Sequence, residues 1–282
     1  MGLPTPLVDV RWLSENLGTA NLIVLDASVP PVVPGFVSIN SQGPFRAIPG
    51  ARRFDYDKEI CKPNSSLPHM MPSPELFTAK ARELGINQNS IIVVYDDVGL
   101  YASPRAWWML KAMGHSQVAV LDGGLPAWIA AGNSVSDQLE LAGDEGDFKA
   151  AAQEHLFCDF EQVLKATQDE QFSIIDARSA GRFVGTAPEP RPGVRSGHMP
   201  NARNLPFAEV LSDGFLKTPA ELEALFANKA TKHQTIITSC GSGITACVLT
   251  LAAYAGGYQN LSVYDGSWAE WGMPGKLPVV TD

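Results

Sequence analysis

The stretch Thr235-Ile236-Ile237-Thr238-Ser239-Cys240 decides the fold class, because an earlier stretch of the same chain is similar to it. That earlier stretch is Ser90-Ile91-Ile92-Val93-Val94-Tyr95-Asp96. Both are short β-branched runs that end in a residue with a polar or reactive side chain. A run of this kind is typical of a strand that is buried on both faces of a parallel sheet. The same strand is therefore expected twice in one chain.

Three further pairs of blocks repeat in the same order, and such internal similarity indicates a duplicated architecture. They pair Ile23–Ala27 with Ile174–Arg178, Ile48–Arg52 with Met199–Arg203, and Asp122–Trp128 with Asp265–Trp271. A chain of 282 residues is long enough for two domains of ordinary size. We expect a first domain over residues 1–133, an acidic linker over 134–154 and a second domain over 155–282. The linker is expected to be solvated because its acidic side chains precede any basic one.

Within each copy, short apolar runs alternate with longer amphipathic stretches. In the second copy this pattern predicts strands at 172–175, 235–238 and 261–264 and helices at 219–227 and 245–255. In the first copy, Pro72-Ser73-Pro74 indicates the start of a helix over 75–84. The predicted fold class is α/β, with two tandem domains that each contain a parallel sheet with helices on both faces.

The charge and the cysteines exclude several kinds of protein. A formal net charge of −9 argues against a nucleic-acid binder. There is no apolar run of eighteen residues that would span a membrane, and the first residues resemble no secretory signal. The cysteines are few and scattered without a Cys-x-x-Cys pair, which disfavours a disulfide framework or a zinc site. We therefore expect a cytoplasmic protein without a metal. The four cysteines are Cys61, Cys158, Cys240 and Cys247.

Cys240 is the candidate nucleophile. It follows a predicted strand at the carboxyl edge of a parallel sheet, where ligands bind in such folds. Gly241 and Gly243 allow the loop to curl and to point its amides inward, and the next helix contributes a positive N-terminus. This setting favours the thiolate, which is the reactive form. A buried structural cysteine in a strand-to-helix turn is the alternative, and the local motif alone does not decide between them.

With the repeated blocks and the loop Cys240-Gly241-Ser242-Gly243-Ile244-Thr245, the chain resembles the rhodanese superfamily over residues 7–272. It is most similar to the tandem-domain sulfurtransferases, in which the first domain is catalytically silent. Asp96 agrees with that pattern, because it stands where the second copy has Cys240. The resemblance implies two rhodanese-like domains, a persulfide on Cys240 and no organic cofactor.

The residues after Cys240 indicate the sulfur donor. Thiosulfate sulfurtransferases of the liver type have Arg and Lys directly after the cysteine, whereas this chain has Gly241 and Ser242. The neutral loop is similar to that of 3-mercaptopyruvate sulfurtransferases. The related phosphatases have a Cys-x5-Arg loop, and the position of that arginine is Ala246 here. A phosphatase is therefore not expected.

The same resemblance implies further site residues. Arg182 and Arg191 match arginines that bind the substrate, although most arginines in such loops are merely solvated. Ser242, His69 and Asp57 match a serine, histidine and aspartate relay of the family, and the two from the first copy would bring the site between the domains. His69 lies in a proline-rich loop, where a lone histidine usually has no function. The substrate-binding set is completed by Gly241, Gly243, Ile244 and Thr245.

The resemblance implies the following reaction. Sulfur moves from 3-mercaptopyruvate through the Cys240 persulfide to a thiol such as thioredoxin or a small dithiol, or to cyanide, and pyruvate is released. Two alternatives remain: thiosulfate as the donor, or a rhodanese-like module that relays sulfur or binds partners without turnover. No nucleic-acid or membrane partner is expected.

Overall fold

The computed structural model describes residues 2–281 and divides into two compact units. Unit 1 comprises Met1–Pro63, Met71–Gln153 and Asp213–Leu216. Unit 2 comprises Asn64–Met70, Glu154–Ser212 and Lys217–Asp282. Each unit thus includes a short segment from the opposite half of the sequence. No helix within residues 2–281 combines the length and the apolar character needed to cross a membrane.

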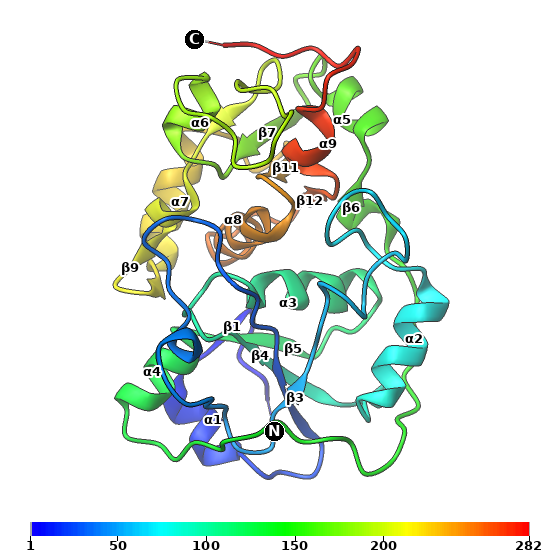
Figure 1. Ribbon diagram of the computed structural model, residues 1–282, viewed down its shortest axis with the longest axis vertical. Coiled ribbons are helices and arrows are strands. Elements are labelled where there is room, and N and C mark those ends of the chain that lie inside the picture. Colours follow the sequence, from blue (N-terminus) through cyan, green and yellow to red (C-terminus); the bar gives the residue numbers. More distant parts are fainter. Residues whose placement is uncertain (1, 282) are drawn as a thin grey trace. The chain divides into compact units, whose positions relative to one another are not determined.

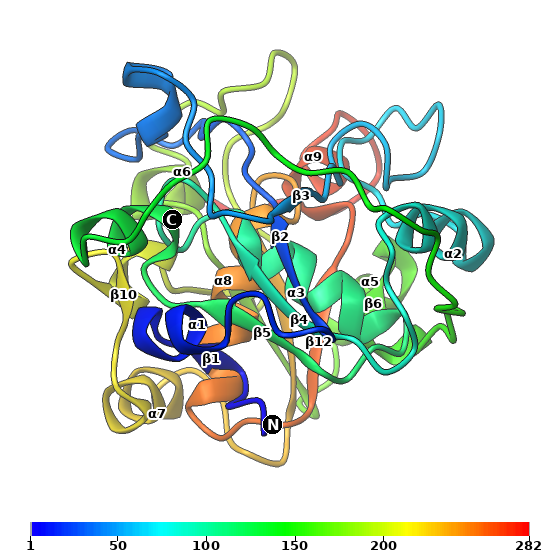
Figure 2. The same cartoon turned by 90° about the horizontal axis from the view of Figure 1, so that it is seen from below.

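Unit 1 is built on a five-stranded sheet in the order β1-β5-β4-β2-β3, with every neighbouring pair parallel (Figure 2). Helix α3 lies on one side of the sheet, and α1 and α4 lie on the other (Figure 1). Its elements are β1 (Leu7–Val8), α1 (Val10–Asn16), β2 (Leu22–Asp26), the 3-10 helix η1 (Ile39–Gln42), β3 (Arg52–Arg53), α2 (Pro74–Glu83), β4 (Ile91–Tyr95), α3 (Ser103–Ala112), β5 (Val118–Leu121), α4 (Gly124–Ala130) and β10 (Phe215–Leu216).

Local chemistry explains where these elements begin and what they bury. The Ser73 side chain accepts a hydrogen bond from the Leu76 amide and Pro74 occupies the first turn, so α2 starts at Pro74, one residue before the predicted start. The tryptophans Trp107, Trp108 and Trp128 are almost fully buried in unit 1.

Unit 2 repeats the same plan. Its sheet has the order β6-β12-β11-β7-β8, again parallel throughout. One apolar cluster joins α5, α9 and the central strands through Val163, Trp268 and Trp271, while α7 packs on α8. Its elements are η2 (Glu154–Leu156), β6 (Phe157–Cys158), α5 (Phe160–Ala166), β7 (Phe172–Asp176), α6 (Ala180–Val184), β8 (Arg203–Asn204), η3 (Phe207–Val210), β9 (Leu211–Ser212), α7 (Pro219–Ala227), β11 (Thr235–Ser239), α8 (Ile244–Ala255), β12 (Leu261–Tyr264) and α9 (Ser267–Trp271).

Two parallel sheets with helices confirm the predicted fold class. The strand order of unit 2 matches that of unit 1 position by position, as a duplication requires. The Leu125 amide of unit 1 donates to the carbonyl of Asp96, and the Trp268 amide of unit 2 donates to that of Cys240, each at 2.9 Å. The two copies thus share the strand-to-helix connection in which Asp96 and Cys240 lie.

The segment 134–154 was expected to be a linker, but it belongs to unit 1 as far as Gln153. Its acidic side chains are exposed, but Phe148 within it is completely buried. The Phe148 ring packs edge-on against Phe77, and the Phe148 amide donates to the Ile86 carbonyl. The segment is therefore held along unit 1 by an apolar anchor, which the acidic composition did not indicate.

The segment Asp213–Leu216 also belongs to unit 1. The Leu216 amide donates to Asp122 Oδ1 at 2.9 Å. The Phe215 ring lies so near to Gly123 that a Cβ there would approach it to 2.5 Å. This residue pair requires glycine at 123, where φ is +75°.

Candidate active site

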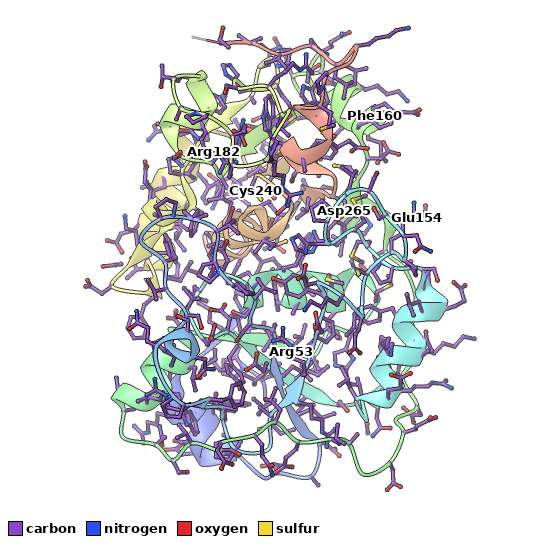
Figure 3. The ribbon with its side chains drawn as sticks, in the orientation of Figure 1. Arg53, Glu154, Phe160, Arg182, Cys240 and Asp265 are labelled. Atoms are coloured by element: carbon purple, nitrogen blue, oxygen red, sulfur yellow. The ribbon has the colours of Figure 1, made fainter. Side chains whose placement is uncertain are left out.

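Cys240 directly follows β11 in unit 2 and precedes α8 by a short loop (Figure 3). The residue is buried, with 2% of its surface exposed. The Gly243 amide donates a hydrogen bond to Cys240 Sγ at 3.1 Å. Gly243 has φ +85°, a left-handed conformation that glycine adopts without strain and that turns its amide toward the sulfur. The loop therefore places a backbone donor on the sulfur, as a nest for an anion does.

The remaining amides of this loop extend the nest. The amides of Gly241, Ser242, Ile244 and Thr245 donate to no acceptor within residues 2–281. Ile244 and Thr245 form the first turn of α8, where amides have no intrahelical partner. These groups can hold negative charge that develops on or beyond the Cys240 sulfur.

A second segment fixes the backbone of Cys240. The Ser267 hydroxyl accepts a hydrogen bond from the Cys240 amide at 3.2 Å and donates to the Tyr264 carbonyl at 2.9 Å. Ser267 is completely buried and has φ +50°, which is uncommon for a residue other than glycine. The Ala269 amide donates to the Gly241 carbonyl at 2.9 Å. The start of α9 thus binds the backbone amide of Cys240 and the backbone carbonyl of Gly241.

Arg182 lies against the same loop (Figure 3). Its Nη2 atom would lie 3.3 Å from a Cβ on Gly241, so the glycine provides the space that the guanidinium occupies. Arg182 Nε donates to Glu189 Oε1 at 3.1 Å, and Nη2 donates to Oε2 at 2.5 Å. The carboxylate of Glu189 therefore covers one edge of the guanidinium, and the edge formed by Nη1 and Nη2 can bind a second carboxylate.

Glu189 also joins Arg182 to a buried ion network. Its Oε1 atom accepts from Arg178 Nη1 at 2.8 Å, and Arg178 Nη2 donates to Asp176 Oδ2 at 2.6 Å. The side chains of Asp176, Arg178 and Glu189 are at most 4% exposed. The Arg178 guanidinium stacks over the Trp268 ring at 4.0 Å. Arg178 is thus a structural residue that supports both Glu189 and Trp268 of α9.

The other predicted residues of unit 2 lie as follows. Arg191 is exposed, and its side chain makes no hydrogen bond or ion pair with another described residue. Ser242 is half-buried in the nest loop. Its hydroxyl forms no hydrogen bond to any of residues 2–281. The structure thus brings Arg182 and Ser242 to the Cys240 loop, and it records no contact between Arg191 and that loop.

The predicted relay residues of the first copy belong to different units. His69 lies in Asn64–Met70, which belongs to unit 2, and has φ +57°. Asp57 lies in unit 1. The nearby Asp55 accepts hydrogen bonds at its Oδ1 atom from the backbone amides of Asp57 and Lys58. Asp55 thus has a local structural role, and Asp57 stays the candidate. The relay itself stays a prediction.

Glu189 and Ser267 are the functional candidates that sequence reasoning missed. Glu189 lies between the two predicted arginines, and a lone carboxylate flanked by Pro188 and Pro190 shows no pattern that reveals its partners. Ser267 stands in a repeated block opposite Gly124 of the first copy. That exchange of a glycine for a side chain with a hydroxyl was the available signal.

The other cysteines are less suited to be nucleophiles. Burial raises the pKa of the Cys158 thiol to about 12. Burial and the carboxylates of Asp57 and Asp55 raise the pKa of the Cys61 thiol. Cys247 is fully buried and donates its S–H to the Gly243 carbonyl at 3.3 Å. Residues 2–281 contain no group of three His, Cys, Asp or Glu side chains that is arranged to hold a metal ion.

Known proteins resemble this chain in both of its halves. The model of the rhodanese-like domain matches residues 9–131 and again 159–273. The chain is 39% identical to 3-mercaptopyruvate sulfurtransferase of Escherichia coli (strain K12) over 278 residues, which is 98% of each chain. It is also 39% identical to rat thiosulfate sulfurtransferase, over 94% of this chain and 91% of the relative.

A solved structure shares the fold. The crystal structure of an Escherichia coli protein described among the 3-mercaptopyruvate sulfotransferases superposes with a TM-score of 0.82 at 36% identity, and the match covers 94% of this chain and 100% of that one. The resemblance seen in the sequence is confirmed. Two matched domains and a shared fold lead to one conclusion: the chain belongs to the rhodanese family.

Proposed function

We propose that this protein is a 3-mercaptopyruvate sulfurtransferase that carries sulfur as a persulfide on Cys240. The observation that carries the proposal is the Cys240 loop, in which the Gly243 amide donates to the sulfur and Arg182 lies beside Gly241. A substrate with both a sulfur atom and a carboxylate fits this site, because the loop amide binds negative charge on sulfur and the Arg182 guanidinium can bind a carboxylate. Full-length similarity to the E. coli enzyme supports the same reaction.

The proposed reaction has two steps. The Cys240 thiolate attacks the sulfur of 3-mercaptopyruvate, the carbon–sulfur bond breaks, and the electron pair leaves as the enolate of pyruvate, which takes up a proton. An acceptor thiolate then attacks the outer sulfur of the persulfide, and Cys240 leaves as a thiolate. Covalent catalysis thus divides one difficult transfer into two easier steps.

The surrounding residues have distinct proposed roles. Arg182 and Arg191 bind the substrate carboxylate, and the amides of Gly241, Gly243, Ile244 and Thr245 hold the outer sulfur. Ser242, with His69 and Asp57, serves the ketone and the proton that pyruvate takes up. The acceptor is a small dithiol or thioredoxin, and the expected compartment is the cytoplasm.

Intact-mass measurement tests the proposal. After addition of 3-mercaptopyruvate, the wild-type protein should gain about 32 Da, the mass of one sulfur atom. Cys240→Ser should gain nothing and lose at least about a thousandfold in kcat. Cys61→Ser is the matched control and should behave as the wild type. An adduct that persists in Cys240→Ser, or no adduct in any variant, would refute the persulfide.

Thiosulfate is the second candidate donor, because a thiosulfate sulfurtransferase is among the relatives at 39% identity. Donor preference separates the two. The neutral pair Gly241-Ser242 provides no cation beside the sulfur, so kcat/KM should be higher for 3-mercaptopyruvate than for thiosulfate. A clear preference for thiosulfate would replace the proposed substrate while the persulfide mechanism stands.

A further inference from the structure

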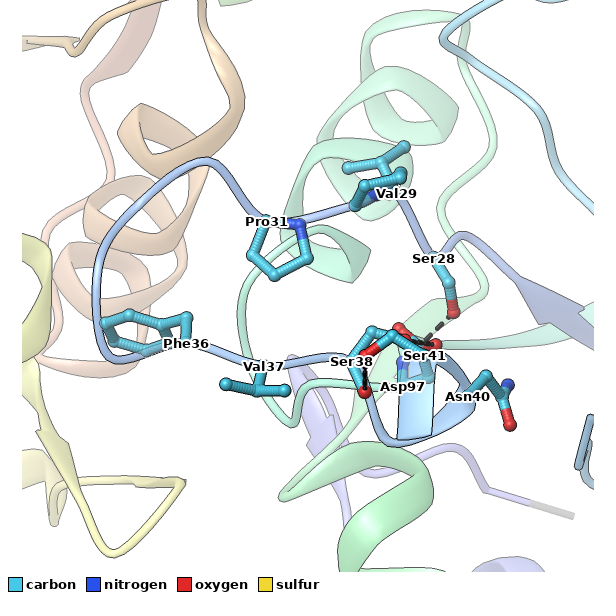
Figure 4. Close-up of a pocket in the computed structure, with 10 residues that line it drawn as sticks. Ser28, Val29, Pro31, Phe36, Val37, Ser38, Asn40, Ser41 and Asp97 are labelled. Carbon is cyan, nitrogen blue, oxygen red and sulfur yellow. Dashed lines mark hydrogen bonds between the residues drawn. The ribbon is translucent and has the colours of Figure 1, made fainter. Parts of the chain in front are cut away.

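Unit 1 contains a pocket of about 530 Å³ beneath the loop that follows β2 (Figure 4). This volume is within the range of pockets that bind small molecules. Val29, Pro31 and Phe36 form apolar walls, and Ser28, Ser38 and Asp97 contribute polar groups. None of the residues proposed for the reaction lines this pocket, so the proposed reaction gives it no role.

Asp97 is the unusual residue of this pocket. It is 4% exposed. Its Oδ2 atom accepts a hydrogen bond from the Ser38 hydroxyl, and its backbone amide donates to Ser28 Oγ at 3.0 Å. Its Oδ1 atom is buried and has no hydrogen-bond donor within residues 2–281. A buried carboxylate oxygen without a donor is costly, and it calls for a partner that the described chain does not supply.

The neighbouring carboxylates show what Asp97 lacks. Asp26 accepts from the Ser28 amide at 2.9 Å and pairs with Arg53 at 3.0 Å. Asp96 accepts six hydrogen bonds. Burial, together with the charges of Asp96 and Asp26, raises the pKa of Asp97. Three carboxylates thus gather at one sheet edge, and the group that would balance the third is a cation.

We propose that this pocket binds a small organic cation, an ammonium or guanidinium group on a short apolar stem, with the Asp97 carboxylate as its counterion. The described residues that line the pocket include no Lys, Arg or His to compete for the carboxylate. When the Ser38 hydroxyl, which lies on the pocket wall, turns away from Oδ2, the cation reaches the carboxylate, takes the place of the hydroxyl at Oδ2 and supplies the donor that Oδ1 lacks. The stem packs against Val29 and Phe36.

An NMR titration of the full-length protein with n-butylammonium chloride tests this site, at constant ionic strength and with amide shifts as the readout. The wild type should show saturable shifts that include Ser28, Ser38 and Asp97. Asp97→Asn keeps the shape but removes the charge, and it should weaken binding at least about tenfold. Glu140→Gln removes the same charge from an exposed side chain of unit 1 and should leave the affinity unchanged.

Two further arms make the result decisive. The neutral probe 1-butanol should bind much more weakly than n-butylammonium. Equal binding of the two probes would mean that the pocket selects only an apolar stem, and it would overturn the proposal. Ser38→Ala removes the hydroxyl that competes for Oδ2 and should tighten binding by about fivefold, the value of one hydrogen bond. Unchanged or weaker binding in Ser38→Ala, or wild-type affinity in Asp97→Asn, would also overturn it.

Discussion

The loops that follow β4 and β11 lie at equivalent positions in the two units, but different groups occupy their anion-binding nests. In unit 1 the Asp96 carboxylate accepts six hydrogen bonds, at distances from 2.7 to 3.0 Å, from Val98, Gly99, Tyr101, Ala102 and Ser103. In unit 2 the nest holds the Cys240 sulfur, with the Gly243 amide as donor. The first copy therefore has the anion site but fills it with its own side chain.

Loop length accompanies this difference. The loop between Asp96 and the start of α3 at Ser103 is longer than that between Cys240 and the start of α8 at Ile244. The longer loop wraps its amides around a carboxylate, whereas the shorter one has amides that donate to no acceptor within residues 2–281. Unit 1 thus keeps the strand order of unit 2 while the Asp96 side chain occupies its own nest.

Removal of the internal anion should have the largest effect. Asp96→Ala leaves the donors of the first nest buried and unpaired, and should lower the free energy of unfolding by about 3–5 kcal/mol. Urea denaturation followed by circular dichroism measures this. Cys240→Ala is the matched control in the second nest and should cost less than about 2 kcal/mol. Equal losses in the two variants would show that the two loops are filled alike.

The second-largest effect is expected from the loss of Arg182, which lies beside the Cys240 loop. Arg182→Ala should lower kcat/KM for 3-mercaptopyruvate by about a hundredfold, because a charged bidentate contact is lost. The discharge of a preformed persulfide by an acceptor thiol should be unchanged, since that step needs no carboxylate clamp. Arg191→Ala should have a smaller effect, because the Arg191 side chain is exposed. If Arg182→Ala has wild-type kinetics, the clamp is elsewhere.

Glu189 orients that arginine, and its loss should cost less. Glu189→Gln should lower kcat/KM by about tenfold through a misplaced guanidinium. In the Arg182→Ala background the same change should add little, because the two residues act as one unit. Additive effects of the two substitutions on kcat/KM would separate Glu189 from Arg182. Glu189→Asp keeps the charge and serves as the variant for kinetics if Glu189→Gln unfolds.

The smallest effect is expected from copying a residue of the first unit into the second. Gly124 of unit 1 has φ +54°, and a Cβ there would lie 2.5 Å from the Asp96 carbonyl oxygen. Ser267→Gly reproduces this residue beside Cys240, and should lower kcat about fivefold through the lost hydrogen bond to the Cys240 amide. Ser267→Thr, which keeps a hydroxyl, provides the comparison. A Ser267→Gly variant with full kcat would mean that the backbone alone holds Cys240.

The fold could be predicted because burial on both faces leaves a strong pattern in short segments. The helix over 219–227 and the strand over 261–264 have their predicted bounds, and β11 extends the predicted strand only to Ser239. The segment 134–154 could not be predicted fully, because its acids dominate the composition while one residue, Phe148, fixes it to unit 1.

The candidate site was predictable where its residues are consecutive. The curled conformation of the loop from Cys240 to Thr245 could be predicted from its two glycines. The roles of Glu189 and Ser267 depend on segments that meet only after folding, and on a left-handed backbone at a serine. Asp97 could not be predicted for another reason. The lack of a donor to its Oδ1 atom can be recognised only when the positions of all surrounding donors are known.

The segment Asp213–Leu216 has a consequence for how the chain is made. Unit 1 takes Phe215 and the Leu216 amide from a part of the chain that follows most of unit 2. A ribosome must therefore synthesise 216 of the 282 residues before the first unit can be completed, although 153 residues would otherwise suffice. Domains generally fold in the order of their synthesis, but here the earlier unit is complete only once the segment Asp213–Leu216 has been made. A fragment that ends at Gln153 would expose Gly123 where Phe215 belongs.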